Sequence, residues 1–84
     1  MSNDMRKMVE KKAKIQFKDA DISIKLEEGK LVISVEGVLN DVTDLMNNIA
    51  SFVETTGKFT GLPNFDIVLS VQGTFYSFEL EMYK

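Results

Sequence analysis

The side chains able to carry out acid–base or nucleophilic chemistry in this chain are carboxylates, lysines, hydroxyls and phenols. The sequence has no histidine and no cysteine. Histidine is the usual general base near neutral pH and belongs to the common nucleophilic triads. Cysteine would be needed for disulfides or thiolate metal sites. We therefore expect a protein that is not an enzyme, with no catalytic residues, no cofactor and no metal.

Two carboxylate patterns resemble binding or catalytic motifs. Residues 19–23 begin like a calcium-binding loop, but Ile24 stands where glycine is required and Lys30 where a bidentate glutamate is required. Glu79 and Glu81 share one strand face, and paired carboxylates can hydrolyse glycosides. An 84-residue sheet protein offers no obvious substrate cleft. Both patterns are therefore interpreted as solvent-exposed structure.

The charges divide the chain into a basic head, residues 1–18, and an acidic body, residues 19–84. The head carries six basic residues against two acids, a net charge of +4, and the body carries four against eleven, a net charge of −7. A basic segment favours an acidic partner such as nucleic acid. The candidate nucleic-acid-binding residues are Arg6, Lys7, Lys11, Lys12, Lys14 and Lys18.

One helix is predicted over about residues 41–56. Its apolar positions repeat at helical spacing and form one stripe, Val42, Leu45, Met46, Ile49, Phe52 and Val53. Asn40 or Asp41 is suited to cap its beginning, and Gly57 is suited to the left-handed position after its end. We expect this stripe to pack in the core.

Two β-hairpins are predicted, at about 22–36 and 65–83. In both, apolar and polar residues alternate on either side of a turn that contains glycine, Gly29 or Gly73. A short N-terminal helix to about Lys12 and a further strand at 13–17 are also predicted, because Ala13, Ile15 and Phe17 alternate with polar residues.

Together these elements predict a single domain, residues 1–84, of the α+β class. An antiparallel sheet of four or five strands would have the 41–56 helix on one face and solvent on the other. The solvated face is acidic and could bind a basic protein surface. Its candidate partner-binding residues are Glu36, Asp66, Glu79, Glu81, Phe75 and Tyr83, and Lys25 is the one base expected there.

Three functions follow from these surfaces. The first is a non-catalytic protein-interaction module whose acidic sheet face binds a basic surface of another protein. The second is a nucleic-acid-binding accessory protein that uses residues 6–18. The third is a structural or assembly subunit, a homo-oligomer formed through an exposed strand edge.

At the level of class, the chain resembles small acidic proteins of phages and other mobile elements. That resemblance, carried by short length, acidity and lack of catalytic side chains, implies an inhibitor or adaptor of host machinery. The sequence shows no apolar run long enough to span a membrane and no apolar segment of a secretory signal in residues 1–9. We therefore expect a cytoplasmic protein that does not bind membranes.

Overall fold

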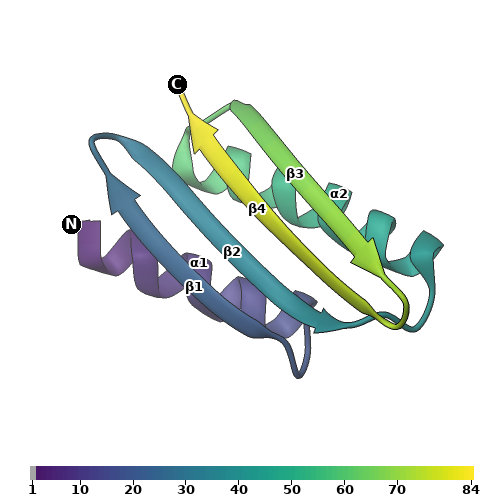
Figure 1. Cartoon of the computed structure of the whole chain (residues 1–84). Helices are drawn as coiled ribbons and strands as arrows, with labels where there is room; N and C mark the ends of the chain where they lie inside the picture. The colour runs from purple at the N-terminus through teal and green to yellow at the C-terminus, as the bar shows by residue number, and fades with distance from the viewer. Residues whose placement is uncertain (1) are drawn as a thin grey trace.

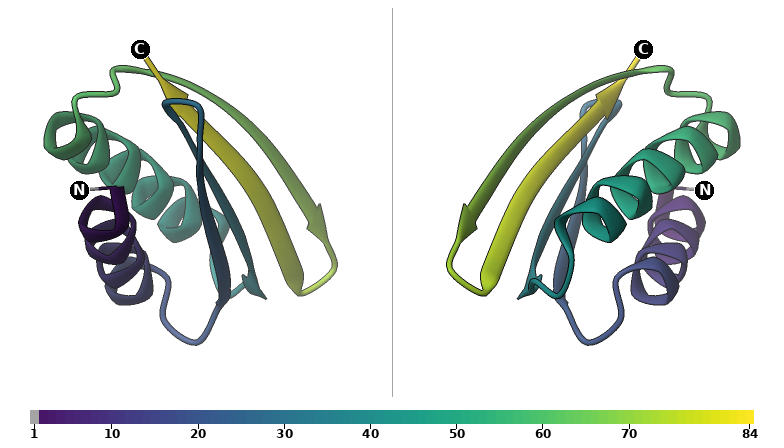
Figure 2. Two further views of the ribbon diagram at one scale, coloured as in Figure 1. Left: turned by 90° about the vertical axis from the view of Figure 1, so that its left-hand side faces the viewer. Right: turned by 90° about the vertical axis from the view of Figure 1, so that its right-hand side faces the viewer.

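The computed structural model of the chain describes residues 2–84, with side chains from Asp4 onward. Its elements follow the order α1 (Ser2–Gln16), β1 (Asp21–Glu27), β2 (Lys30–Val38), α2 (Val42–Thr60), β3 (Asn64–Gln72) and β4 (Phe75–Tyr83). The four strands form one antiparallel sheet in the order β1-β2-β4-β3 (Figure 1). Both helices lie on one face of this sheet (Figure 2). The predicted α+β class is confirmed.

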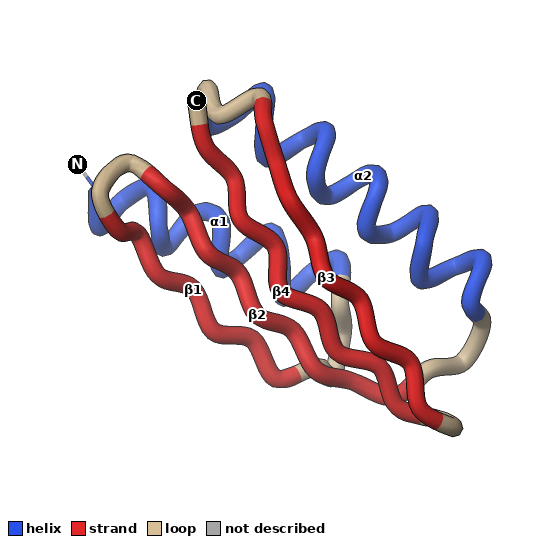
Figure 3. The backbone as a smooth tube through the Cα atoms, turned by 45° about the horizontal axis from the view of Figure 1, so that its top comes forward, coloured by secondary structure: helices blue, strands red, loops and turns tan. Residues whose placement is uncertain are grey.

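The chain consists of two similar units, each a helix followed by a hairpin. The units are α1-β1-β2 and α2-β3-β4. Their second strands, β2 and β4, pair at the centre of the sheet, from Leu31 opposite Met82 to Val38 opposite Phe75. As a result β1 and β3 are the two edge strands, with α1 behind the first hairpin and α2 on the side of the second (Figure 3).

Helix α1 is longer than predicted and replaces the strand predicted at 13–17, which is wrong. Val9, Ala13 and Phe17 follow at intervals of four, which continues one helix face, and all three are buried. Strand alternation predicts that Ile15 shares a face with Ala13 and Phe17, but Ile15 is 65% exposed. The helical spacing prevails because it joins these residues to Val9 in a single buried row.

Helix α2 begins as predicted and ends later. The Asp41 carboxylate caps it, accepting hydrogen bonds from the backbone N–H of Thr43 (2.8 Å) and Asp44 (3.3 Å). The prediction that Gly57 ends the helix is wrong, because Gly61 holds the left-handed conformation (φ 73°) and donates its N–H to the Gly57 carbonyl. Gly57 lies inside the helix, where the returning chain passes close by.

The centre of the core is an aromatic cluster around Phe17. Its ring contacts Phe52 of α2 and Phe78 of β4 edge-on, with ring centroids 5.6 and 5.2 Å apart. Such pairs add roughly 0.5–1.5 kcal/mol each beyond the burial of their area. One side chain, directly after α1, therefore ties both helices to the sheet.

The second unit leaves part of its predicted core open. On α2, Val42 and Met46 belong to the predicted core stripe but are 55% and 48% exposed. On the helix-facing side of β3, Phe65 and Val71 are 47% and 43% exposed. Figure 2 shows α2 and the β3-β4 hairpin diverging toward the hairpin turn. The sequence pattern thus predicts which face these residues occupy, but not how far they are covered.

Candidate functional site

The face of the sheet without helices carries most of the acids of the strands. Strand pairing places these side chains in rows across the sheet: Lys25, Val32, Glu81 and Asp66; Ser23, Ser34, Glu79 and Val68; Asp21, Glu36, Ser77 and Ser70. Two pairs of carboxylates are direct cross-strand neighbours, Asp66 with Glu81 and Asp21 with Glu36. Like charges in this relation destabilise a sheet. Each pair therefore lowers the stability of the sheet unless neighbouring groups compensate it.

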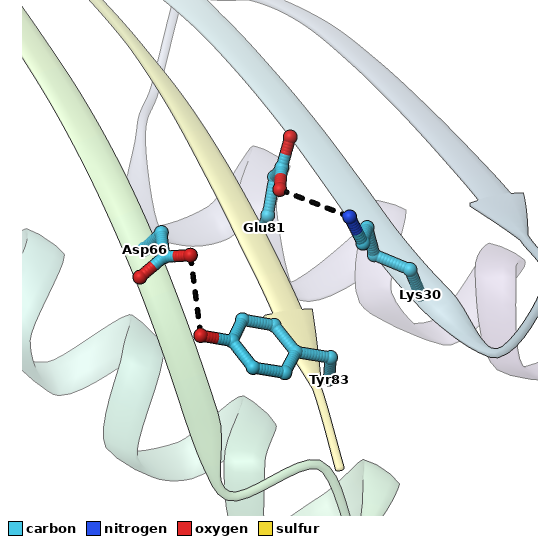
Figure 4. A network of polar contacts seen from close by, with 4 residues as sticks. All are labelled: Lys30, Asp66, Glu81 and Tyr83. Atoms are coloured by element: carbon cyan, nitrogen blue, oxygen red, sulfur yellow. Dashed lines mark hydrogen bonds and ion pairs between the residues drawn. The ribbon is translucent and has the colours of Figure 1, made fainter.

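The Asp66–Glu81 pair is compensated by neighbouring side chains (Figure 4). The Lys30 ammonium lies 3.3 Å from Glu81 Oε1, and the Tyr83 hydroxyl donates a hydrogen bond to Asp66 Oδ2 at 3.2 Å. The hydrogen bond to Asp66, together with the negative charge of that carboxylate, raises the pKa of Tyr83 above its ordinary value. This end of the face is already paired within the chain.

The Asp21–Glu36 pair has no such compensation. Among the side chains of residues 4–84, the ion pairs are Lys14–Glu10, Lys30–Glu81 and Lys58–Glu54, so neither Asp21 nor Glu36 takes part in one. The two carboxylates line a hollow of about 460 Å³. Its other lining residues include Asp19, from the turn after α1, and two exposed apolar side chains, Val38 and Phe75.

This arrangement, which we call the acidic hollow (Asp19, Asp21, Glu36, Val38 and Phe75), is suited to a long cationic side chain. Phe75 is 64% exposed and lies opposite Val38 in the strand pairing, so together they offer an apolar surface. An arginine or lysine has an apolar stem that packs on such a surface and a charged head that seeks carboxylates. Arginine can also stack on an aromatic ring.

The predicted partner-binding residues are therefore divided by the structure. Glu36 and Phe75 lie together in the acidic hollow, whereas Asp66, Glu81 and Tyr83 form the paired cluster at the other end. Glu79 lies between them, opposite Ser34 and Val68. All six are on the predicted face.

Sequence reasoning missed three residues of this face. The change of alternation near Asp21 predicts a turn or a bulge there, but the turn at 28–29 fixes a register that places Asp21 opposite Glu36. Val38 extends β2 beyond the predicted end of its hairpin. Lys30 opens β2 and pairs with Glu81, so Lys25 is not the one base of this face, and that expectation is wrong.

Most of the predicted basic head forms helix α1, which lies on the helix-covered face of the sheet, opposite the acidic face. Lys7, Lys11 and Lys14 are exposed and follow at i, i+4 and i+7, so they share one helix face. Glu10 lies among them and pairs with Lys14 at 3.5 Å. The other basic residues do not join this row: Lys12 lies 5.5 Å from the ring centroid of Phe59 on α2, Arg6 is half-buried, and Lys18 follows the helix.

A larger hollow, of about 880 Å³, opens at the opposite end of the molecule from the acidic hollow. Met5, Leu26 and Leu62 contribute apolar side chains to it, and Asp66, Lys30 and Tyr83 border it. Lys30, Asp66 and Tyr83 already take part in contacts within the chain, whereas the other charged residues of the lining, Glu28 and Lys84, do not form ion pairs.

Within residues 2–84, carboxylates do not gather into a group of three that could hold a metal ion. This includes the three carboxylates of the acidic hollow, which share its lining without converging on one point. In the same part of the chain, neither helix has the length and apolar character needed to cross a membrane.

Comparisons with known proteins give no family assignment. No protein-family model matches the chain, and the curated proteins searched contain no significantly similar sequence.

Proposed function

We propose that this chain is a non-catalytic protein-interaction module that binds a basic surface of another protein through the acidic hollow. The observation that supports this most directly is the uncompensated Asp21–Glu36 pair beside the exposed ring of Phe75. Two adjacent carboxylates without a cation reduce the stability of the free protein. An incoming arginine or lysine would remove that repulsion and cover the exposed ring.

The partner we propose is a protein with a basic, nucleic-acid-binding surface, and the setting is the cytoplasm. Such surfaces present arginine and lysine in quantity. An acidic module that covers them would act as an inhibitor or adaptor, of the kind found in phages and mobile elements. The acidity of the sheet face and the resemblance to small acidic proteins of phages and mobile elements support this choice of partner.

The binding proposal is tested with a defined cationic probe, an acetylated and amidated tetra-arginine peptide. Titration followed by backbone amide NMR shifts should perturb Asp21, Glu36 and Phe75 before other residues. Binding should weaken with added salt, because salt screens exposed charges. The double variant Asp21→Asn, Glu36→Gln should lose most of the binding, and Phe75→Ala should lose part of it.

A matched control removes the same charge elsewhere. Asp44→Asn with Glu54→Gln takes two carboxylates from α2, which lies on the other side of the sheet, and should leave the probe affinity nearly unchanged. Equal losses from both double variants would mean that the peptide responds only to net charge. Shifts spread evenly over the chain would contradict the proposed site in the same way.

The second candidate function is nucleic-acid binding through the exposed row Lys7, Lys11 and Lys14. The observation that favours it is their common helix face, with exposed Ile15 beside them. Each lysine that neutralises a phosphate releases a counterion, so binding to a short DNA duplex should weaken steeply with salt. Changing all three to glutamine should reduce the slope of the logarithm of the binding constant against the logarithm of the salt concentration by about three.

The control for this candidate is the variant Lys25→Gln, Lys30→Gln, Lys58→Gln. It removes the same charge from positions outside the α1 row. Duplex binding that responds equally to both triple variants, or that is independent of salt, would eliminate a specific role for α1.

A further inference from the structure

The edge strand β3 has few of the features that keep edge strands from pairing. Its nine residues contain no proline, glycine or lysine, and Asp66 is its one charged residue. Its pairing with β4 runs without a bulge from Asn64 opposite Tyr83 to Gln72 opposite Phe75. Soluble proteins usually protect an edge with charges, prolines or bulges. A long, regular and nearly uncharged edge is a surface for another strand.

The polar backbone groups that β3 offers follow from the sheet register. In an antiparallel pair, residues alternate between hydrogen-bonded and non-hydrogen-bonded positions. The N–H of Leu39 donates to the Thr74 carbonyl at 2.7 Å, which continues the β2–β4 register by one step. The backbone N–H and C=O groups of Thr74, and of every second residue after it, therefore face β2. The backbone groups of the intervening residues of β4, beginning with Phe75, face β3.

The same alternation continues into β3. Asn64, Val68 and Gln72 each lie opposite a β4 residue whose backbone N–H and C=O groups face β3. Their own backbone N–H and C=O groups therefore face β4. The residues whose N–H and C=O groups face the open edge are Phe65, Ile67, Leu69 and Val71. These backbone groups require hydrogen-bond partners. The side chains of the same four residues lie on the helix-facing side of the sheet, where the helices cover them incompletely.

Helix α2 presents a matching surface beside this edge. Asn48 accepts a hydrogen bond from the Gln16 side chain of α1 at 2.8 Å, so its flank of α2 faces α1. The opposite flank, across the buried row of Leu45, Ile49 and Phe52, is free of charge. It consists of Val42, Met46, Ala50 and Val53. Small and apolar residues there allow another helix to approach closely.

We propose that β3 is the interface of a symmetric dimer, in which two copies pair β3 with β3 in antiparallel register about Val68. The two sheets then continue as one sheet of eight strands, four from each copy, with all helices on the same side. The uncharged flanks of the two α2 helices lie next to each other beneath the new strand pair. The dimer is argued from β3 and α2 and not from the carboxylates of the acidic hollow, although Ser70 and Gln72 of β3 also line that hollow.

The occupant is a second copy because β3 is complementary to itself. About Val68, the helix-facing residues pair as Phe65 with Val71 and Ile67 with Leu69, apolar with apolar on both sides of the axis. All four edge-facing residues of each copy thereby find backbone partners. Asp66 meets Ser70, and the two Asp66 carboxylates stand about 13 Å apart along the strands, beyond the screening length in physiological salt.

The other edge is protected by charge. Strand β1 carries Asp21, Lys25 and Glu27 among its seven residues, and charged side chains on an edge strand disfavour pairing with another strand. The interface is therefore expected at one edge, which gives a closed dimer instead of an open chain of molecules.

The first experiment measures mass in solution by sedimentation velocity from low micromolar to millimolar concentration. The chain of 9.5 kDa should approach 19 kDa, twice its mass, and no further. Val68→Lys places two ammonium groups across the axis and should yield monomer. Val68 is 72% exposed, so the fold should be retained, as circular dichroism can verify. Ile15→Lys, at a similarly exposed position on α1, should leave the dimer intact.

Charge exchange tests the axis itself. Val68→Lys and Val68→Asp should each be monomeric alone, because like charges meet at the centre. An equimolar mixture should restore the dimer, since the opposed residues then attract. Monomer at every concentration, a dimer unaffected by Val68→Lys, species that grow beyond the dimer, or a mixture that stays monomeric would each overturn the proposal.

A cysteine variant gives an independent measurement, because the natural chain contains no cysteine. Val68 meets its own copy as a non-hydrogen-bonded pair, whose Cα separation of about 4.5 Å suits a disulfide. Val68→Cys should therefore form a covalent dimer rapidly on mild oxidation, whereas Ser70→Cys, opposite Asp66, should not. Equal rates for the two variants would contradict this register.

Discussion

The two helix–hairpin units of this protein use the same order of elements but cover their edge strands to different extents. In the first unit, α1 lies close against β1, and Ile24 of β1 is buried. In the second unit, more of the α2 backbone lies near α1 than near any one strand, and both Phe65 and Val71 of β3 remain exposed near the ends of the strand. One unit is closed and the other is open at its edge.

This difference shows that the alternation of a strand and its coverage are separate properties. Both β1 and β3 alternate apolar and polar residues, and both turn their apolar side toward the helices. Coverage depends on where the helix lies, and that depends on the contacts of its whole length. The open unit is thus the place where an additional partner gains most from binding.

The largest expected effect contrasts one aromatic residue from each region. Phe17→Ala should reduce the free energy of unfolding by roughly 3–5 kcal/mol, because it empties the centre of the aromatic cluster. Phe65→Ala, on β3, should cost about half as much or less, because nearly half of its surface is already in water. Urea denaturation at low protein concentration measures both. Equal losses would mean that the open region is as tightly packed as the closed one.

The next effect concerns how α2 ends. Gly61 has a φ of 73°, which a side chain makes unfavourable, so Gly61→Ala should destabilise the protein by about 1 kcal/mol. Gly29 serves as a control, since it too has a positive φ with open space around it but lies in the first unit. Thermal unfolding of both variants should show similar losses. A neutral Gly61→Ala would mean that α2 does not need the left-handed position to end.

The amino-acid sequence alone predicted most of the architecture. Both hairpins, a helix start at Asn40 or Asp41, and the faces of the side chains within the two predicted hairpins agree with the structure. Local signals were sufficient there, because glycine turns and strict alternation leave few other conformations. Residues 13–17 fit both strand alternation and helical spacing, so the segment alone does not determine its structure. The deciding residue is Val9, which lies outside the segment and continues the helical row of Ala13 and Phe17.

The site was less predictable because it depends on which strands are neighbours. Glu36 and Phe75 come from different hairpins, and nothing local to either states that β2 pairs with β4. Gly57 illustrates the same limit: it has the residue type of a helix end, but its lack of a side chain serves the passage of Leu62, whose carbonyl lies 3.3 Å from where a Cβ would be. Contacts of this kind belong to the tertiary structure.

A smaller effect compares the two carboxylate pairs of the solvated face. Glu36→Gln should stabilise the free protein by roughly 0.2–1 kcal/mol, because it relieves repulsion from Asp21. Glu81→Gln should change stability by less than about 0.5 kcal/mol, since it relieves Asp66 but also loses the exposed contact with Lys30. Chemical denaturation in low salt measures both changes. Destabilisation by Glu36→Gln would show that Asp21 and Glu36 are compensated after all.

The smallest effect appears at alkaline pH, at the two ends of β4. The pKa of Tyr83 is raised above the ordinary 10.0 by its hydrogen bond to Asp66 and by the charge of that carboxylate, whereas the pKa of Tyr76 is raised by burial. The folded state thus holds these protons more tightly than the unfolded state. The resulting stability is complete below pH 10 and is lost as pH rises through the folded pKa values.

Because the chain has two tyrosines, ultraviolet absorbance titration reports both directly. Both midpoints should lie above 10.0, and Asp66→Asn should lower the midpoint of Tyr83 while leaving that of Tyr76 in place. Tyr83→Phe assigns the remaining transition to Tyr76. If Asp66→Asn moved neither midpoint, the hydrogen bond at the paired end would be absent in solution. Asp66 would then be as uncompensated as Glu36, and the distinction between the two ends of the acidic face would fail.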